Sequence, residues 1–414
     1  MASRCAAALR RRTTVLTIAF LHPDLGLGGA ERFVVDAARA VEHAGHRAVV
    51  LTARHEPRAT FASTAEGTLD VRVRGAWLPS HLAGRARAPC AVVRMGWLAL
   101  AAARLEPAPD VVVCHLVAHV VPILRRTARA PVVFYCQYPD RLLASPGGAA
   151  YRAYRVPLDW LEARGMSAAD RVVVNSRFTA GRFRDAFPRH GGPVPLVIHP
   201  GVAPLACPDL PEEPDGPLVV LALGRFDPRK NARLAIETLA ELRKRIPSAM
   251  FARVQLVLAG GHDERLPEHR ETLRSLETLA VGLDLAAHVT IRCNPSERER
   301  LALLAECRCV VFPPIEEHFG YVPLEAMSAG RPVIAVARGG PAETVVHGET
   351  GLLFPPTPAA FAGALATLLT EPATAARMGR AGRAHVAAHF SLDRFGKTFT
   401  ALLEDAAVNG SPRG

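Results

Sequence analysis

The sequence lacks the cysteine pattern of a metal-binding or disulfide-stabilised protein. Its eight cysteines are scattered without a C-x-x-C pair, and the single C-x-C, at Cys307 and Cys309, is a weak metal signal. Several cysteines lie inside apolar runs, where a thiol packs as a small hydrophobic group. No Asp-x-Asp pair stands in a metal-site context. We therefore expect no metal, no disulfide framework and a reducing compartment.

Long apolar runs are also missing. The most apolar segment, residues 91–103, is shorter and more interrupted than a typical bilayer-spanning helix. One interpretation is a core helix of the first domain. The alternative is an interfacial helix, in which Arg85, Arg87, Arg94 and Trp97 would suit anionic headgroups. The apolar residues after the basic tail (residues 1–12) are interpreted as a first buried strand, and a targeting role for that tail stays open.

Motifs for nucleic acid and for nicotinamide are absent. No zinc-finger spacing, basic zipper or aromatic-basic RNA motif occurs, so the net charge of +11, carried mostly by arginine, points to membrane or nucleotide phosphates instead. A nicotinamide site requires G-x-G-x-x-G and an acid after the second strand. Here the loop reads GLGGAE (residues 26–31), and the second strand ends with Thr52 and Arg54.

The 414 residues alternate between apolar strand-like runs and helical segments, in two similar halves. This rhythm predicts an α/β protein with two doubly wound Rossmann-like domains facing a cleft. Six prolines between residues 200 and 217 mark the clearest change in composition and predict the interdomain linker. The predicted domains are residues 14–199 and residues 218–385.

The stretch between residues 313 and 343 organises the predicted chemistry. It follows the apolar run 309–312 and contains a second one, 332–336. Both runs are typical of buried parallel strands, and the segment between them has room for a loop and a short helix. Glu317 falls in the loop and Glu325 one turn inside a helix expected from Val322, so both carboxylates could face one space. Gly320 allows close backbone approach, and a helix N-terminus favours anions. The alternative is an ordinary loop with solvated carboxylates.

Cations follow the first strand of the second half. Arg225 and Lys230 come after the strand 217–226, and Asn231 stands where the next helix begins. Two cations beside a helix N-terminus can hold a diphosphate and neutralise charge on a leaving group. A solvated basic loop is the alternative. Later in the chain, Gly260 and Gly261 would let a ribose or base approach the backbone.

Four residues of the first half are candidates for the same cleft. Gly28 and Gly29 open a helix and fit a phosphate or a sugar hydroxyl. His115 ends a predicted strand, which is a plausible site position in an α/β sheet, although a single histidine is more often structural. Ser176 is a good helix N-cap and could have that role alone.

Several longer motifs carry a resemblance to a known family. The segment from Glu317 to Glu325, together with GGPAE and HGETGLL, is similar to the acidic region of retaining glycosyltransferases with the two-domain GT-B architecture. HPDLGLGGAER, FYCQYPD, PLDWLE, NSRFTA and AGGHDER resemble the mannosyltransferases that build the dolichol-linked N-glycan precursor. The resemblance covers residues 14–405. Two positions depart from the family pattern, because Gln137 replaces a histidine and His115 replaces an aspartate.

The resemblance implies an activity and a location. We expect a GDP-mannose-dependent retaining enzyme that adds alpha-1,3 and then alpha-1,6 mannose to dolichyl-diphosphate-linked Man1GlcNAc2. It would act at the cytosolic face of the endoplasmic reticulum membrane, in contact with the membrane surface and in complex with other early mannosyltransferases. No cofactor, metal or nucleic acid is expected. The alternatives are a related enzyme with another donor or acceptor and a non-catalytic scaffold member.

The resemblance also implies residue roles. Arg225 and Lys230 would hold the diphosphate, Glu325 would orient the ribose, and Glu317 would bind mannose hydroxyls. The reaction centre would be lined by His115 and the Gly28-Gly29 loop. The remaining expected donor residues are Gly260, Gly261, Phe319 and Gly320, with Gln137 on the acceptor side. The C-terminal helix, residues 386–406, would cross back to the first domain.

Overall fold

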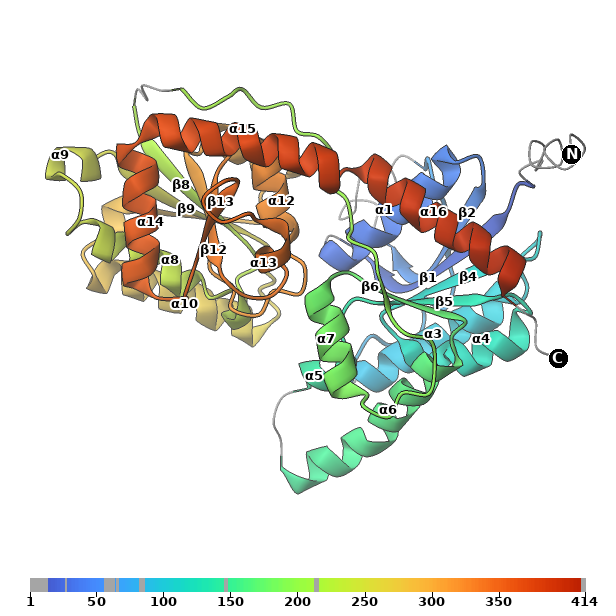
Figure 1. The fold of residues 1–414 in the computed structure, drawn as a ribbon. Coiled ribbons are helices and arrows are strands. Elements are labelled where there is room, and N and C mark those ends of the chain that lie inside the picture. The colour runs from blue at the N-terminus through green and yellow to red at the C-terminus, as the bar shows by residue number, and fades with distance from the viewer. Residues whose placement is uncertain are drawn as a thin grey trace, which may run out of the picture. The chain divides into compact units, whose positions relative to one another are not determined.

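The computed structural model describes most of the chain as two compact units (Figure 1). The described residues are 14–26, 28–55, 64, 67–81, 86–144, 148–211 and 216–410. Within them, the first unit contains the residues up to Val174, Ala180–Ile198 and those from Gly396 onward. The second unit contains Asn175–Thr179 and His199–Phe395. The predicted α/β class with two Rossmann-like sheets is confirmed, and we describe each unit by itself.

The first unit is built on a seven-stranded sheet in which every strand pair is parallel. The strand order is β3-β2-β1-β4-β5-β6-β7. The central strands β4 and β5 are apolar along almost their whole length because helices cover both faces of the sheet. The strands are β1 Thr17–Leu25, β2 Arg47–His55, β3 Asp70–Val73, β4 Val111–His115, β5 Val132–Cys136, β6 Arg171–Val174 and β7 Leu196–Val197.

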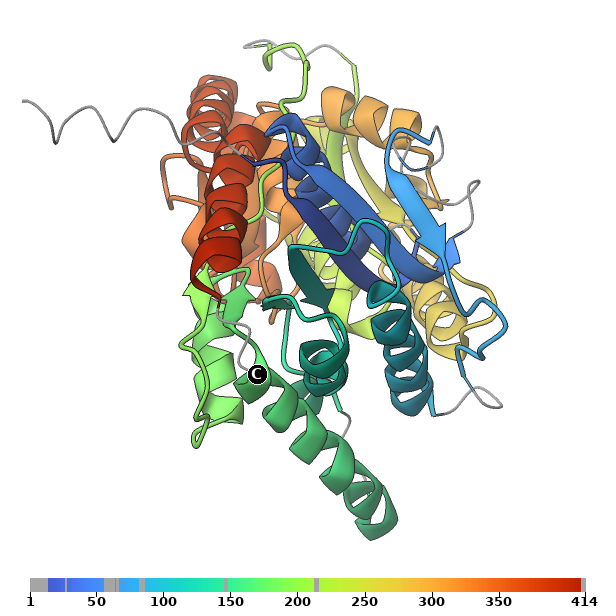
Figure 2. The same cartoon turned by 90° about the vertical axis from the view of Figure 1, so that its right-hand side faces the viewer.

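Helices α1 and α16 lie on one face of this sheet, and α3, α4 and α6 lie on the other (Figures 1 and 2). Helix α1 buries Phe33, Val34, Ala37, Ala38 and Val41, a spacing that places one apolar stripe against the strands. The helical segments are α1 Gly29–His43, α3 Arg87–Ala102, η3 Ala118–Val120, α4 Val121–Thr127, α5 Asp140–Leu143, α6 Ala149–Ala168, α7 Arg177–Ala186 and α16 Leu392–Asn409.

The second unit repeats this design with a six-stranded parallel sheet in the order β10-β9-β8-β11-β12-β13. Its strands are β8 Leu218–Leu223, β9 Val254–Gly260, β10 Val289–Cys293, β11 Cys309–Phe312, β12 Val333–Val336 and β13 Gly351–Phe354. Its helices are η4 Pro228–Lys230, α8 Ala232–Leu242, α9 Ser248–Phe251, α10 Pro267–Gly282, η5 Ala286–His288, α11 Glu297–Glu306, α12 Tyr321–Ser328, α13 Pro341–Thr344, α14 Pro358–Thr370 and α15 Pro372–His389.

Each sheet has one point at which the strand order reverses. In the first unit the reversal lies between β1 and β4, and in the second it lies between β8 and β11. At such a point the two loops after the strands diverge to opposite faces and leave a crevice at the carboxyl edge, where ligands of open α/β sheets bind. The loops that follow β1, β4, β8 and β11 are therefore the candidate ligand-binding loops.

The structure divides the chain differently from the predicted boundaries. The described part of the proposed linker, residues 200–217, packs on the second unit: Val202 bridges to Ser391, and the backbone N–H of Leu205 donates to Ser328 Oγ at 3.1 Å. The proline-rich composition reflects an irregular path over a surface rather than a free connection. The single C-terminal helix predicted for 386–406 is two helices, α15 and α16, separated at Phe390 and Ser391.

Two further elements differ from the sequence interpretation. Strand β1 continues through HPDL to Leu25, so the glycine turn is shorter than expected. Helix α3 begins at Arg87 and buries Met95 and Leu98, which agrees with a core helix, while its outer face stays exposed. Arg85 lies outside the described residues. Across the helices that the structure describes, none combines the length and apolarity needed to span a membrane.

Candidate active site

Two oppositely charged side chains meet at the reversal point of the second sheet. Lys230 ends the short helix η4 after β8, and Glu317 lies in the loop after β11. Lys230 Nζ donates to Glu317 Oε2 at 2.6 Å. Burial opposes ionisation of Glu317, but the charge and hydrogen bond of Lys230 outweigh it and hold the pKa of this carboxyl below its ordinary value. Residues 87 positions apart thus form a charged pair at the crevice edge.

The GG of the GGPAE motif fits against the loop that carries Glu317. A Cβ on Gly339, whose φ is +72°, would stand 2.3 Å from the carbonyl oxygen of Glu317. A Cβ on Gly340 would stand 2.2 Å from the carbonyl oxygen of Phe319, and the N–H of Gly340 donates to the Glu317 carbonyl at 2.8 Å. The two loops can pack backbone to backbone only because both positions lack a side chain.

Gly320 begins helix α12 with a φ of +87°, in the region that favours glycine. The N-terminus of α12 starts directly after it, and Phe319 is 2% exposed in the core beneath the loop. Glu325 lies inside the helix, 5% exposed, and forms an ion pair with Arg300 of α11. The two acidic residues of the predicted pair therefore have different cationic partners, Lys230 for Glu317 and Arg300 for Glu325.

The loops after β8 and β9 place a second cation, Arg225, and glycine backbone at the same carboxyl edge of the sheet. Arg225 follows β8 and is exposed, and Phe226 N–H donates to the Gly261 carbonyl at 2.9 Å. Because Leu223 pairs with Ala259, the next residue of each strand lies side by side. A Cβ on Gly260 would stand 1.9 Å from the Gly224 carbonyl oxygen, so this register requires glycine at residue 260.

Sequence reasoning assigned no role to several residues that the structure brings into this loop cluster. Glu343 accepts backbone N–H groups from Arg177 at 2.9 Å and Phe178 at 2.6 Å, and it lies 3.1 Å from His199 Nε2. Only its place in the GGPAE motif marked it. His318 directly follows Glu317, and burial lowers the pKa of its imidazole to about 4. Arg300 carries no sequence signal because its partner is 25 positions away.

Ser176 has more than the capping role. Its Oγ accepts the N–H of Thr179 at 2.9 Å, as expected of an N-cap, and lies 2.6 Å from the carbonyl oxygen of His318. The NSRFT segment of the sequence is thereby tied to the loop that carries Glu317.

The reversal point of the first sheet holds a buried pair of histidines. His22 lies on β1 and His115 ends β4, with their Nδ1 atoms 3.0 Å apart. Their side chains are almost fully buried. His22 Nε2 also lies 3.8 Å from Oε1 of Glu31, in the first turn of α1. One imidazole must donate to the other, so the pair has a defined tautomer relationship.

The glycine loop and Gln137 adjoin this pair. Gly28 is the N-cap of α1 and Gly29 its first residue, and a Cβ on Gly28 would stand 2.3 Å from Glu31 Oε2. Burial and the neighbouring His22 hold the pKa of His115 well below its ordinary value, and a hydrogen bond with Gln137 acts in the opposite direction. His115 is therefore neutral at physiological pH.

The predicted site residues thus divide between the units. The loops of the second sheet bring together Arg225, Lys230, Glu317 and the glycines Gly260, Gly261 and Gly320. The loops of the first sheet bring together Gly28, Gly29, His115 and Gln137. Among the described residues, no group of three or more His, Cys, Asp or Glu side chains has the proximity needed to hold a metal ion.

Two family models match the chain, one over each half. Residues 27–204 match the model described as Glycosyltransferase Family 4, and residues 209–385 match Glycosyl transferases group 1. Among solved structures, HepE from Anabaena in complex with UDP and glucose has a TM-score of 0.72 at 21% identity, covering 94% of this chain and 100% of that one. WaaG, a glycosyltransferase of lipopolysaccharide biosynthesis, has a TM-score of 0.65 at 19% identity, covering 94% and 98%. The fold is that of the two-domain GT-B glycosyltransferases.

Curated relatives narrow this class. Alpha-1,3/1,6-mannosyltransferase ALG2 of Mus musculus is 41% identical over 397 residues, covering 93% of this chain and 95% of that protein. The Homo sapiens protein of the same name is 41% identical over 392 residues, covering 92% and 93%. The Saccharomyces cerevisiae protein is 35% identical over 390 residues, covering 84% and 76%. The chain belongs to this family of alpha-1,3/1,6-mannosyltransferases.

Proposed function

We propose that the protein transfers mannose from GDP-mannose to dolichyl-diphosphate-linked Man1GlcNAc2, first in alpha-1,3 and then in alpha-1,6 linkage. The observation that carries the proposal is the Lys230–Glu317 pair, which lies where the strand order of the second sheet reverses. Relatives of the chain are named alpha-1,3/1,6-mannosyltransferases, after the two linkages proposed here. The donor nucleotide, the acceptor and the order of addition are parts of the proposal.

The donor diphosphate would bind where Lys230 and Arg225 follow β8. Both cations precede α8, so its N-terminal amide groups add to the positive potential at that edge. As the bond between mannose and phosphate breaks, negative charge grows on the diphosphate. Cations already held in place stabilise that charge without reorganising, and this is the main way in which such a site lowers the barrier.

The two carboxylates would position the donor's sugars. Glu317 stays ionised at neutral pH and can accept hydrogen bonds from mannose hydroxyls beside the diphosphate. Glu325 is held by Arg300 and would accept hydrogen bonds from the ribose. Gly260, Gly261, Phe319 and Gly320 would allow the nucleotide to approach the backbone.

Retention of configuration would follow from attack on the same face as the departing diphosphate. In the first unit, the Gly28-Gly29 loop and neutral His115 would line the acceptor side, with Gln137 as His115's partner. A neutral imidazole can accept or donate a hydrogen bond to a sugar hydroxyl without adding charge. None of these residues requires a metal or cofactor for its role, so we expect transfer to persist in EDTA.

We place the enzyme at the cytosolic face of the endoplasmic reticulum membrane, where a dolichol-linked acceptor would be presented, and in complex with other early mannosyltransferases. The lipid tail of the acceptor supports contact with a membrane surface. These placements follow from the proposed acceptor.

The test is transfer of labelled mannose from GDP-mannose to a phytanyl-diphosphate chitobiose-mannose acceptor, with linkages determined in the product. Two added mannoses, one alpha-1,3 and one alpha-1,6, are expected. Transfer from another nucleotide sugar alone would replace the donor assignment. A folded protein that transfers nothing from any tested donor would overturn the enzymatic proposal in favour of a scaffold.

A further inference from the structure

Two buried histidines lie side by side where the strand order of the first sheet reverses. Leu21 of β1 pairs with Cys114 of β4, so the residues that follow them, His22 and His115, are neighbours at the carboxyl edge. Their Nδ1 atoms are 3.0 Å apart, and the exposed fractions of the two residues are 0% and 1%. Burying polar ring nitrogens costs free energy that apolar side chains at the same positions would not cost. Packing alone therefore does not explain the pair.

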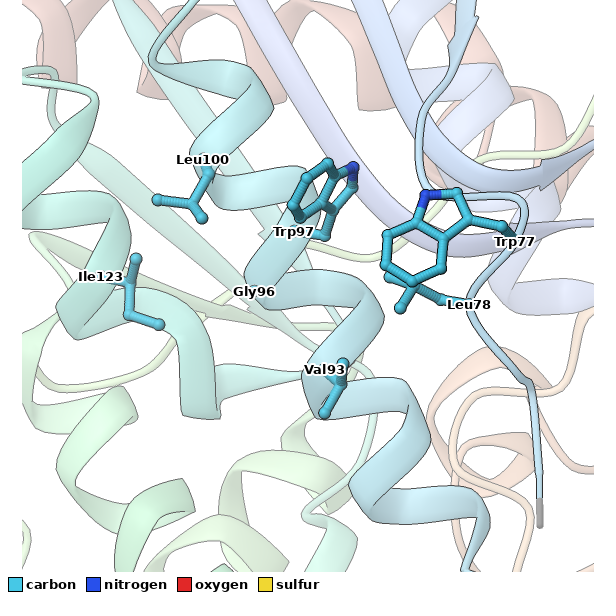
Figure 3. Close-up of a pocket in the computed structure, with 7 residues that line it drawn as sticks. All are labelled: Trp77, Leu78, Val93, Gly96, Trp97, Leu100 and Ile123. Carbon is cyan, nitrogen blue, oxygen red and sulfur yellow. The ribbon is translucent and has the colours of Figure 1, made fainter.

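The two histidines point to the side of the sheet that carries α1. Side chains alternate between the faces of a strand, and Leu21 and Cys114 face the other side, where they join the core beneath α3. Figure 3 shows α3 with the side chains that line a hollow on its outer surface. The hollow and the histidine pair are therefore on opposite sides of one sheet.

Phe33 of α1 covers the pair. Its ring centroid lies 5.2 Å from that of His115 and 3.5 Å from that of Tyr135 on the neighbouring strand, and Phe33 is 1% exposed. The covering rings keep bulk water away from the imidazoles. Polar interactions are stronger in such a region of low dielectric constant than they are in water.

Glu31 connects the pair to the glycine loop. It lies in the first turn of α1, and its Oε1 is 3.8 Å from His22 Nε2. A Cβ on Gly28 would stand 2.3 Å from Oε2 of the same carboxylate, so this carboxylate lies directly against the N-cap residue of α1. One oxygen thus faces the imidazole and the other faces the glycine loop.

The three side chains form one polar connection, which we call the histidine bridge: Glu31, His22 and His115. A carboxylate can only accept, so a proton on His22 Nε2 faces Glu31, and a second proton is shared between the two Nδ1 atoms. The Glu31 side chain is 23% exposed and that of His22 is 1% exposed. The bridge therefore runs from the interior of the sheet to the edge where a ligand would bind.

We propose that His22 and Glu31 are positioning residues that hold the glycine loop and His115 in the geometry that the acceptor sugar requires. The chain segments after β1 and β4 diverge at the reversal point, and His22 joins them. Neither His22 nor Glu31 needs to touch the acceptor, because each acts through a neighbour. The inference rests on the proposed function, in which the Gly28-Gly29 loop and His115 line the acceptor side.

Two substitutions of His22 separate its two contacts. The side-chain amide of asparagine reaches about as far as Nδ1 of histidine, and that of glutamine about as far as Nε2. His22→Asn should therefore keep the contact with His115 and lose the contact with Glu31, and His22→Gln should do the opposite. Native-state amide hydrogen exchange should become faster in residues 28–33 of the asparagine variant and in residues 114–118 of the glutamine variant. Unchanged exchange in both variants, or the same change in both, would contradict the bridge.

Kinetics test whether the bridge serves the acceptor. His22→Asn and Glu31→Gln should each raise KM for the phytanyl-diphosphate chitobiose-mannose acceptor by about fivefold or more, because a small displacement of positioning groups weakens productive binding. The Kd of GDP, measured by titration calorimetry, should stay within about twofold, since the proposed donor residues belong to the second unit. The double variant should be little worse than either single variant, because both remove the same contact. An unchanged acceptor KM, or an equal rise in the Kd of GDP, would overturn the proposal.

His46 supplies the matched control. It is also buried in the first unit, at 7% exposure, with Nε2 3.0 Å from Glu404 Oε1 and Nδ1 accepting the backbone N–H of Leu16 at 3.3 Å. It directly precedes β2, at the opposite edge of the sheet from His22. His46→Asn should lower the thermal midpoint about as much as His22→Asn does and leave the acceptor KM unchanged. A comparable rise in KM would assign the effect of His22 to general stability instead of positioning.

Hydrogen exchange separates this inference from the proposed function because it requires no turnover. If the wild type transfers no mannose from GDP-mannose but the His22 variants show the expected exchange patterns, the proposed function fails and the histidine bridge stands. If the wild type forms both linkages and the His22 variants match it in exchange and in acceptor KM, the bridge fails and the function stands.

Discussion

At the scale of single residues, the Lys230–Glu317 pair sets the charge of the proposed donor site. Lys230→Ala removes the cation expected at the diphosphate and should lower kcat/KM by about 10²–10³. It also leaves burial as the main influence on Glu317, so the pKa of that carboxyl should rise. The acid limb of the pH–rate profile should therefore move to higher pH in any residual activity.

Lys244→Ala is the matched control for this substitution. Lys244 Nζ lies 2.6 Å from Glu241 Oε1, the same distance as in the proposed site, but it is 66% exposed on the surface of the same unit. Its loss should leave kcat/KM and the pH profile unchanged. Equal losses of activity in the two variants would contradict a specific role for Lys230.

The glycines of GGPAE give a second residue-scale prediction. Gly339 and Gly348 have similar positive φ angles, +72° and +80°, so alanine strains both backbones by about 1 kcal/mol. Only at Gly339 would the new Cβ also collide with the Glu317 carbonyl. We expect Gly339→Ala to lower the free energy of unfolding by at least ~3 kcal/mol and to impair transfer.

Gly348→Ala isolates the strain because nothing lies within 4 Å of its added Cβ. Chemical denaturation of the two variants supplies the comparison. Equal stability losses would show that the collision is relieved by a small loop movement, and that close packing against Glu317 is not required.

Sequence reasoning reached part of this residue network. Lys230, Glu317 and the glycines are marked by local patterns, since each is a charged or flexible residue just after an apolar strand. Arg300, His22 and Glu31 were missed because their partners are set by the fold. Nothing near residue 300 indicates that α11 directs an arginine at Glu325, and a histidine inside a strand has the same pattern whether or not a second histidine faces it.

At the scale of secondary-structure elements, Glu162 of α6 joins two helices of the first unit. Its carboxylate accepts the N–H groups of Asp140 and Arg141, at 2.6 and 3.1 Å, at the start of α5. Burial and the neighbouring Asp140 charge raise the pKa of Glu162 to about 7. The folded state therefore holds its proton more tightly than the unfolded state does.

The sign of the pH dependence follows from this. The stabilising effect of the protonated Glu162 is present below the ordinary pKa of 4.5 and is lost as pH rises toward 7. This group alone should lower the free energy of unfolding by ~3 kcal/mol across that window. Glu162→Gln should remove that slope in denaturation curves of the full chain. Asp185→Asn, an exposed change on α7, should retain it, and an unchanged slope in Glu162→Gln would refute the assignment.

Element positions were more predictable than element boundaries. The strands at 309–312 and 333–336 were recognisable because burial on both faces makes them uniformly apolar. Strand β1 was predicted too short because His22 and Asp24 interrupt its apolar run, and the pattern does not reveal that these side chains contact His115 and Arg94. The prolines before β8 predicted an interdomain linker, and composition alone does not reveal that part of this segment packs on the second unit.

At the scale of the whole molecule, each unit has a core of its own, and the proposed donor residues all belong to the second. A ligand stabilises the state to which it binds. Saturating GDP should therefore slow hydrogen exchange mainly in the second unit, around residues 224–231 and 313–325. CMP provides the control ligand. Strong protection around His115 without change near Lys230 would place the nucleotide in the wrong unit and contradict the donor assignment.

The architecture as a whole was predictable because alternation of strands and helices, repeated in two halves, leaves few compact solutions. The assignment of individual segments to one unit or the other was less predictable. Residues 175–179 interrupt the first half yet belong to the second unit, and the last helix begins in the second unit and ends in the first. Such exchanges depend on contacts between distant segments, which no local pattern records.

The return of α16 to the first unit has a consequence for how the protein is made. Phe399 is fully buried against Phe33, and Gly396 lies where a Cβ would stand 2.9 Å from Ala40. A ribosome must translate residues 199–395 before it reaches the segment that covers this side of α1, which takes roughly 10–40 s. Until then the nascent first unit exposes an apolar face. A chaperone that holds the emerging chain would find its binding site there, and a stop codon before residue 396 would leave that site open permanently.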